Sequence, residues 1–224
     1  MPAPTRPAPE GALFVTFEGG EGSGKSTQVA RLRSRLLVRG RAVLATREPG
    51  GSPRAEEIRS VLLGGAAASH GPAAEALLFA AARADHLART IRPALAEGKV
   101  VLCDRFLDST RVYQGERLPG DLLAALERVC LGGTMPDLTL ILDLPAAVGL
   151  ERATARRTAR RETVDRFEAE DLAVHDRLRA AYLALAAAEP GRCAVIDASG
   201  SPDAVAAGVW AAIAPRLGAT GLAR

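Results

Sequence analysis

The residues with the most recognisable chemistry lie near the start of the chain, where positions 19–26 read GGEGSGKS. This run fits the pattern G-x-x-x-x-G-K-[S/T], in which backbone N–H groups of a glycine-rich turn surround a phosphate. Lys25 can supply a mobile positive charge for the β- and γ-phosphates of a nucleotide, and the Ser26 hydroxyl can ligate Mg²⁺. A β-forming run at 13–17 precedes the motif and a helical pattern follows it, as this motif requires. The sequence therefore predicts a nucleotide-phosphate site here.

A second candidate group is the pair Asp104 and Arg105, which directly follows the apolar run 99–103. An acid at the end of a buried strand can hold the water shell of Mg²⁺, and an adjacent arginine can bind a phosphate. Acids also follow other apolar runs, at Glu18, Asp143 and Asp197. Each of these acids, taken singly, is better explained as a plain strand-end residue. The arginine beside Asp104 makes that position the metal candidate.

Arginines that could neutralise a migrating phosphoryl group occur in two further places. Residues 156–161 contain four arginines and no acid, and Arg47 lies just beyond another apolar run. The four are Arg156, Arg157, Arg160 and Arg161. Such a cluster can form a lid that closes over a nucleotide, but it is also typical of a solvated helix face or a nucleic-acid-binding patch.

A site for a second ligand is indicated by Phe79 and Arg83, which are four residues apart on a predicted helix over 72–96 and so share a face. The residues expected to form the buried stripe of this helix are Leu77, Ala80, Ala84, Leu87, Ile91 and Leu95. Phe79 lies roughly 200° around the helix from Leu77. Its ring could stack on a base while Arg83 donates to a base carbonyl. The alternative is that the pair forms a second core face.

The elements that must position these residues alternate between strand and helix. The expected strands are 13–17, 42–46, 99–103, 138–142 and 192–196. The expected helices are the one that follows the glycine motif and ends at Gly40, then 54–63, 72–96, 150–157, 171–188 and 202–217. This alternation predicts a doubly wound α/β domain with a parallel sheet and right-handed crossovers. Its ligands should bind at the carboxyl ends of the strands.

Length and composition agree with one globular domain. The chain has 224 residues, of which 48% are hydrophobic and 25% charged, values that exclude a disordered chain and a membrane protein. The net charge of +3 permits an anionic ligand but does not demand a nucleic-acid polymer. The cysteines, Cys103, Cys130 and Cys193, have no metal-binding spacing and are expected to be buried thiols of a cytoplasmic protein. We expect a disordered, proline-rich arm at 1–11, a domain at 12–218 and a tail at 219–224.

Five blocks of sequence together resemble the bacterial type of thymidylate kinase, a family of P-loop nucleoside monophosphate kinases. The blocks are FEGGEGSGKST at 17–27, TREPGG at 46–51, LLFAAARADH at 77–86, DRFLDSTRVYQG at 104–115 and DRFE at 165–168. The resemblance implies a single P-loop NTPase-type domain with a five-stranded parallel sheet flanked by helices and an arginine-rich lid at about 153–167. It also implies the Mg²⁺-dependent reaction ATP + dTMP → ADP + dTDP in dTTP biosynthesis, and a homodimer.

The resemblance further implies roles for individual residues. ATP would be held by Gly19, Gly20, Glu21, Gly22, Ser23, Gly24, Lys25, Ser26 and Thr27, and the metal by Ser26 and Asp104. Residues placed at dTMP are Glu21, Arg47, Phe79, Arg83, Arg105, Thr110, Tyr113 and Gln114. The catalytic residues would be Lys25, Arg105, Arg156 and Arg161, and which lid arginine reaches the transferred phosphate is left open. The chain departs from the family pattern at Phe106, where a tyrosine or histidine is frequent.

Two other functions remain as alternatives at this point. One is a kinase for another monophosphate, such as dCMP, UMP or GMP, although a donor at Arg83 disfavours the amino group of cytosine. The other is a P-loop protein that binds nucleotide without transferring phosphate, for which the pair Asp104 and Arg105 would have no evident purpose.

Overall fold

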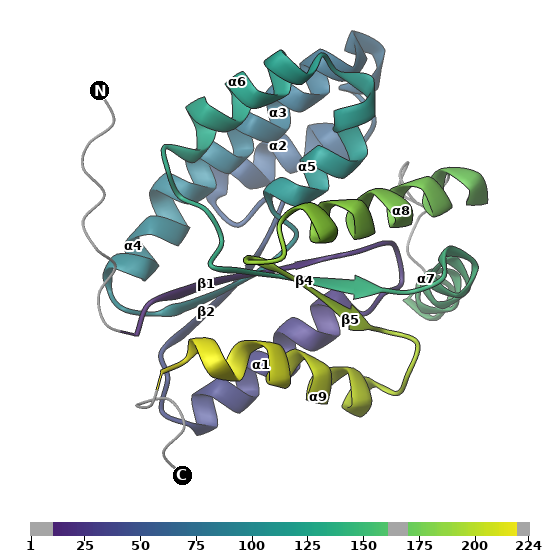
Figure 1. Ribbon diagram of the computed structural model, residues 1–224. Coiled ribbons are helices and arrows are strands. Elements are labelled where there is room, and N and C mark those ends of the chain that lie inside the picture. Colours follow the sequence, from purple (N-terminus) through teal and green to yellow (C-terminus); the bar gives the residue numbers. More distant parts are fainter. Residues whose placement is uncertain (1–10, 161–169, 219–224) are drawn as a thin grey trace.

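The computed structural model describes residues 11–160 and 170–218, and within them five parallel strands form one sheet. The strands are β1 (Leu13–Glu18), β2 (Val43–Arg47), β3 (Val100–Asp104), β4 (Leu138–Asp143) and β5 (Cys193–Asp197), in the spatial order β2-β3-β1-β4-β5 (Figure 1). Each strand lies within one residue of its predicted bounds, and the predicted α/β fold is confirmed. The proposed arm up to residue 10, the tail from 219 and the lid from 161 to 167 lie outside the described residues.

The register of the strands brings several candidate side chains to one edge of the sheet. Asp104 at the end of β3 is paired with Phe17 of β1 on one side and with Arg47 of β2 on the other. Glu18, the last residue of β1, is paired with Ile141 of β4. The loops after β1, β2 and β3 therefore leave the sheet side by side, at the carboxyl edge where ligands of such sheets bind.

Helices cover both faces of the sheet. They are α1 (Lys25–Val38), α2 (Pro53–Leu63), α3 (Gly71–His86), α4 (Arg92–Ala96), α5 (Leu107–Gln114), α6 (Gly120–Leu131), α7 (Ala146–Arg160), α8 (Leu172–Ala188) and α9 (Pro202–Ile213). Figure 1 shows α1 and α9 on one face and α3 to α6 with α8 on the other, while α7 lies beyond the end of β4. The described helices include none with the length and hydropathy of a bilayer span.

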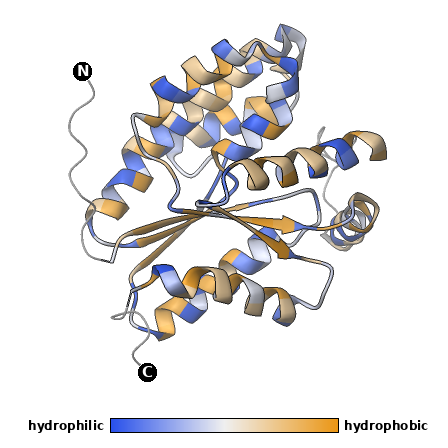
Figure 2. Cartoon of the chain, in the orientation of Figure 1, coloured by the Kyte–Doolittle hydropathy of each residue, from blue (hydrophilic) through white to orange (hydrophobic). Residues whose placement is uncertain are grey.

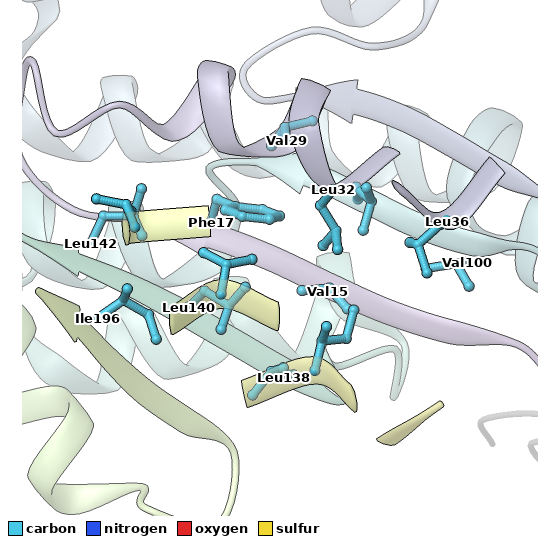
Figure 3. Packing of buried hydrophobic residues seen from close by; sticks show 14 of the residues in the cluster. Val15, Phe17, Val29, Leu32, Leu36, Val100, Leu138, Leu140, Leu142 and Ile196 are labelled. Atoms are coloured by element: carbon cyan, nitrogen blue, oxygen red, sulfur yellow. The ribbon is translucent and has the colours of Figure 1, made fainter. Parts of the chain in front are cut away.

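The core follows from the alternation of side chains along the buried strands. On one face, Val15 and Phe17 of β1 pack with Leu32 and Leu36 of α1, as Figure 3 shows. On the other face, Phe14 packs with residues of α4 to α6 and of the turn before α4. Because both faces are covered, the central strands β1, β3 and β4 are mostly apolar and buried, and Figure 2 shows much of the sheet in orange shades. This burial fixes the strand ends that carry the candidate site.

The predicted helix over 72–96 is interrupted. A π-helical turn, Leu87–Ile91, separates α3 from α4, and Pro93 is the second residue of α4. A widened turn is a frequent response to a proline, which lacks an N–H group and crowds the preceding turn. The helix predicted as one piece over 72–96 is therefore two helices joined by this turn.

The predicted buried stripe is wrong at Leu77, whose exposed fraction is 53%. The buried face of α3 instead carries Glu75, Ala76, Arg83 and His86. Hydropathy assigns such polar residues to the solvent side. The predicted stripe therefore lies on a different side of α3 from the face that is buried in the structure.

Helices α5 and α6 are not among the helices predicted from the sequence. The predicted helix at 150–157 is longer in the structure, where it spans α7. Cys103, Cys130 and Cys193 are buried free thiols, as predicted.

Candidate active site

The glycine-rich loop between β1 and α1 has a shape that larger residues would not allow. Gly19 and Gly22 have φ angles of 131° and 67°, in the left-handed region that favours glycine. A Cβ atom on Gly19 would lie 2.5 Å from the backbone oxygen of Leu142, and one on Gly22 would lie 1.9 Å from that of Gly149. The loop therefore packs directly against β4 and α7, and its backbone N–H groups are fixed in a tight turn before the positive end of α1.

Lys25, the first residue of α1, is held inside this loop. Its ammonium group donates to the carbonyl oxygens of Gly19 at 3.0 Å and Gly20 at 2.7 Å. Burial and the nearby charge of Arg105 lower the pKa of Lys25 to about 8. The side chain is thus positioned before any ligand binds, and a bound anion would favour its charged form.

Ser26 and Asp104 meet at the mouth of the loop. The Ser26 hydroxyl donates to Asp104 Oδ2 at 2.5 Å, so two oxygen ligands from α1 and β3 are adjacent. Among the described residues no group of three or more His, Cys, Asp or Glu side chains could hold a metal ion. One hydroxyl and one carboxylate fit Mg²⁺, which binds few protein oxygens and completes its shell with phosphate and water.

Arg105 occupies a strained position beside the loop. Its φ of 67° is unusual for a residue other than glycine. The guanidinium donates to the carbonyl of Gly19 at 3.4 Å, to Ser109 Oγ at 3.2 Å and to Tyr182 Oη at 3.3 Å. It also forms an ion pair with Glu21. Contacts on several sides therefore determine the direction of this cation, and strained residues held in this way are frequent at functional sites.

Glu21 of the loop is a carboxylate although its side chain is only 15% exposed. Burial acts to raise its pKa, but the charges of Arg105 and Lys25 outweigh burial and lower the pKa to about 2. The hydroxyl of Tyr113 adds a hydrogen bond at 3.2 Å. This single negative charge offsets part of the positive charge of the two cations.

Glu18 is a buried acid that the sequence analysis does not place in the site. Its Oε1 accepts the N–H of Phe106 at 2.8 Å, and its Oε2 accepts the hydroxyls of Ser109 at 2.6 Å and Tyr182 at 3.2 Å. Burial, and then the charge of Asp108, raise its pKa to about 7. Glu18 thus fixes the backbone next to Arg105 and two of the hydroxyls that Arg105 contacts. The sequence signal was an acid directly before the glycine motif.

Arg83 lies on the other side of the cleft and is itself held in place. Its exposed fraction is 3%. Its Nε donates to Glu48 Oε2 at 2.8 Å, and its Nη2 donates to the carbonyl of Phe106 at 3.1 Å and to Thr110 Oγ1 at 3.0 Å. These contacts fix a buried cation at a set position.

Glu48 links Arg83 to the loop after β2. Its Oε1 is 3.0 Å from Nδ1 of His86, and Nε2 of His86 is 2.8 Å from the hydroxyl of Thr46. A Cβ atom on Gly51 would lie 2.3 Å from His86 Nε2, so only glycine allows this close approach. Sequence reasoning placed neither Glu48 nor His86 in the site, although they lie within the blocks TREPGG and LLFAAARADH.

One cleft of about 410 Å³ brings most of the predicted site residues together. Those that line it are Glu21, Gly22, Gly24, Lys25, Ser26, Thr27, Arg47, Phe79, Arg83, Asp104, Arg105, Thr110, Tyr113, Gln114 and Arg156. It is also lined by six residues not predicted for the site: Glu48, Pro49, Arg59, Leu63, Phe106 and Ser109. The remaining loop residues, Gly19, Gly20 and Ser23, accept hydrogen bonds from Lys25. Arg161 lies outside the described residues.

Chemically, the cleft has an anion-binding end and an aromatic end. The anion-binding end combines the glycine loop with Lys25, Arg105 and an oxygen pair suited to Mg²⁺. The aromatic end carries Phe79 with hydrogen-bonding groups such as Arg83. Such an arrangement can bind two phosphate-bearing ligands with their phosphates facing each other.

Comparisons with known proteins agree on one family. The family model described as thymidylate kinase matches residues 17–209. A thymidylate kinase from Caulobacter vibrioides is 58% identical over 208 residues, covering 92% of this chain and 98% of that protein. A thymidylate kinase from Nitrobacter winogradskyi is 58% identical over 206 residues, covering 91% of this chain and 88% of that protein. The crystal structure of thymidylate kinase from Ehrlichia chaffeensis superimposes with a TM-score of 0.71 at 31% identity, covering 91% of this chain and 99% of that one.

Proposed function

The chain belongs to the thymidylate kinase family and catalyses ATP-dependent phosphorylation of dTMP to dTDP, and we propose that both nucleotides bind in the cleft described above. The observation that carries this proposal is that the glycine loop, the pair Asp104 and Arg105, and the side chains of Phe79 and Arg83 line one continuous cavity. Two substrates bound at its ends would place donor and acceptor phosphates next to each other.

The ATP end of the cleft is formed by residues 19–27. The backbone N–H groups of the loop would bind the β-phosphate, with Lys25 between the β- and γ-phosphates. Ser26 and Asp104 would hold Mg²⁺, which neutralises and orients the phosphate oxygens when bound. The short contact between their oxygens supports this assignment.

The dTMP end is formed by the aromatic and hydrogen-bonding side chains. Phe79 stacks on the thymine ring and Arg83 donates to its O4, with Thr110 and Gln114 at the edge of the base. Tyr113 crowds the 2′ position of the sugar and Glu21 lies near its 3′-hydroxyl.

Arg47 and Arg105 bind the phosphate. Arg105 is supported in this role by its fixed direction beside the glycine loop.

Transfer is direct and in line, without a phosphoenzyme. A dTMP phosphate oxygen is already anionic near neutral pH, so the reaction needs alignment and positive charge rather than a general base. Lys25 and Arg105 neutralise the equatorial oxygens, together with an arginine of the lid at about 153–167. Arg156 lines the cleft and is one candidate for that arginine, and Arg161 is the other.

A coupled assay of ADP formation with ATP, Mg²⁺ and a panel of nucleoside monophosphates tests this function. We expect dTMP to have the highest kcat/KM and dCMP and GMP to be poor substrates. A better substrate among the others would make the chain a kinase for another monophosphate, and no turnover with any would make it a binding protein. Inversion at phosphorus with a chiral γ-phosphorothioate of ATP would support direct transfer, whereas retention would require a phosphoenzyme.

We further propose that the protein works as a homodimer in the cytoplasm. Large apolar side chains are exposed on three neighbouring helices, namely Val61 on α2, Leu77 on α3 and Val129 on α6. These would be covered by a second copy. The free thiols fit a reducing compartment. Light scattering should give a dimer mass that falls to a monomer mass in Leu77→Asp, and a monomeric wild-type protein would contradict the proposal.

A further inference from the structure

Gln114 and Glu75 form a buried pair at the base end of the cleft. Gln114 is the last residue of α5 and lines the cleft, and Glu75 lies on α3. Both have exposed fractions of 2%, and Gln114 Nε2 donates to Glu75 Oε1 at 2.9 Å. Glu75 belongs to none of the sequence motifs of the site.

The contact fixes the direction of the Gln114 amide. A carboxylate oxygen can only accept a hydrogen bond, so the NH₂ group of Gln114 must face Glu75. A planar amide with its nitrogen fixed in this way must present its oxygen elsewhere. Within the described residues that oxygen accepts no hydrogen bond. Gln114 therefore offers an acceptor to a ligand in the cleft, whereas Arg83 on the neighbouring helix can only donate.

We propose that Glu75 is a positioning residue for base specificity, because it holds the Gln114 amide oxygen toward the N3–H group of a 2,4-dioxopyrimidine. Thymine presents O4, an acceptor, to Arg83 and N3–H, a donor, to Gln114. Cytosine presents the reverse pattern at both positions and would leave buried polar groups unpaired. The inference rests on the proposed thymine site. It adds Glu75 as the residue that makes Gln114 a hydrogen-bond acceptor, rather than a donor, at N3.

The variant Glu75→Gln tests this inference with almost no change of shape. A glutamine at position 75 can donate or accept, so the Gln114 amide can turn over at little cost. The probe is the dTMP analogue that lacks O4 and therefore carries N3 as a bare acceptor. Because position 4 is empty, Arg83 contributes equally in both enzymes. We expect the ratio of kcat/KM for dTMP to that for the analogue to fall about tenfold or more in Glu75→Gln.

Two further variants separate positioning from a general loss of structure. Asp85→Asn neutralises another acid of α3, which bonds to Ser52 and Arg89 and not to Gln114, and should leave the ratio unchanged. Gln114→Met removes the amide. In that background Glu75→Gln should not change the ratio further, because the proposal routes the effect of Glu75 on the base through the Gln114 amide.

Several results would overturn the inference. One is an unchanged ratio in Glu75→Gln, and another is a second, additive change in the Gln114→Met background. Should Glu75→Gln not fold, an unchanged ratio in Gln114→Met alone would be decisive, because the base would then not be read at Gln114. Failure of the proposed function is distinguishable, because the wild-type enzyme would then show no preference for dTMP over dCMP.

Discussion

Removal of the Arg105 side chain is the most direct test of the proposed chemistry. The guanidinium lies beside the glycine loop, bonded to the carbonyl of Gly19, and pairs with Glu21. In Arg105→Ala the cleft loses the cation that we propose binds the dTMP phosphate beside the glycine loop. Lys25 is bonded to the loop carbonyls and cannot take its place without leaving them.

The expected loss can be stated as a barrier. An arginine that stabilises the charge of a transferring phosphoryl group contributes about 10³–10⁵ in kcat, which corresponds to roughly 4–7 kcal/mol. The variant also leaves Glu21 without its nearest counter-charge, but Lys25 and the hydroxyl of Tyr113 remain. The loss of stability should therefore be smaller than the roughly 3–5 kcal/mol typical of a broken buried ion pair. Steady-state kinetics at saturating ATP and dTMP and a thermal unfolding scan measure the two effects.

Arg111→Ala is the matched control. Arg111 lies on α5 and forms ion pairs with Glu127, Asp108 and Glu189, but it does not line the cleft. It should lose stability and keep its kcat within about tenfold of the wild-type value. The reasoning is refuted if Arg105→Ala also stays within that range, or if both variants are equally slow.

Other variants test separate parts of the site. Phe79→Ala should raise the KM for dTMP more than the KM for ATP, because only the base stacks on the ring; equal increases would reduce Phe79 to a packing role. Asp104→Asn should raise the Mg²⁺ concentration for half-maximal rate by about tenfold or more, and an unchanged requirement would remove Asp104 from the metal site. For Glu18, a folded-state pKa of about 7 against an ordinary 4.5 means that the folded protein binds the proton more tightly. Its stabilising contribution is therefore complete below pH 4.5 and is lost as the pH rises to 7, by up to about 3 kcal/mol. The unfolding free energy of the wild type, minus that of Glu18→Gln, should fall over this range in denaturant titrations; a constant difference would contradict the assignment.

The parts of the fold that the sequence predicts well are those set by local patterns. The strands are apolar because helices cover both faces of the sheet, and the runs that mark them end within a residue of the observed bounds. The glycine loop is equally local, since its spacing and flanking elements define it. The fold class, the family and the position of the glycine loop between β1 and α1 could therefore be predicted without coordinates.

The parts that the sequence analysis misses are those where polar residues are buried. Helix α5 has Asp108, Thr110 and Gln114 on its buried side, so it lacks the apolar periodicity that marks a helix. The same cause rotates the predicted stripe of α3, where Leu77 is exposed and Arg83 is buried. Hydropathy cannot identify a buried charge whose partner lies on a distant segment.

Buried acids have a common use in this site. Glu18 bonds to the backbone beside Arg105, Glu48 bonds to Arg83, and Glu75 bonds to Gln114. Each carboxylate thus fixes one group that faces the cleft, and its own burial is compensated by the hydrogen bonds it accepts. Acids in such positions cannot be assigned to the site from sequence spacing, because their partners are far away in the chain. The partner of Glu75 is 39 residues away, and that of Glu18 is 88 residues away.

Arg47 is exposed and, among the described residues, is not fixed by a buried acid. Its ion pair with Glu56 joins side chains with exposed fractions of 56% and 42%, and such pairs hold a geometry only weakly. In the proposed site the groups that contact the base are therefore set before dTMP binds, whereas Arg47 would have to exchange Glu56 for the incoming phosphate. Fixed groups suit the proposed reading of the base, because discrimination requires that a wrong base leave them unpaired. A phosphate common to all nucleotides imposes no such requirement, and an adaptable arginine is sufficient to bind it.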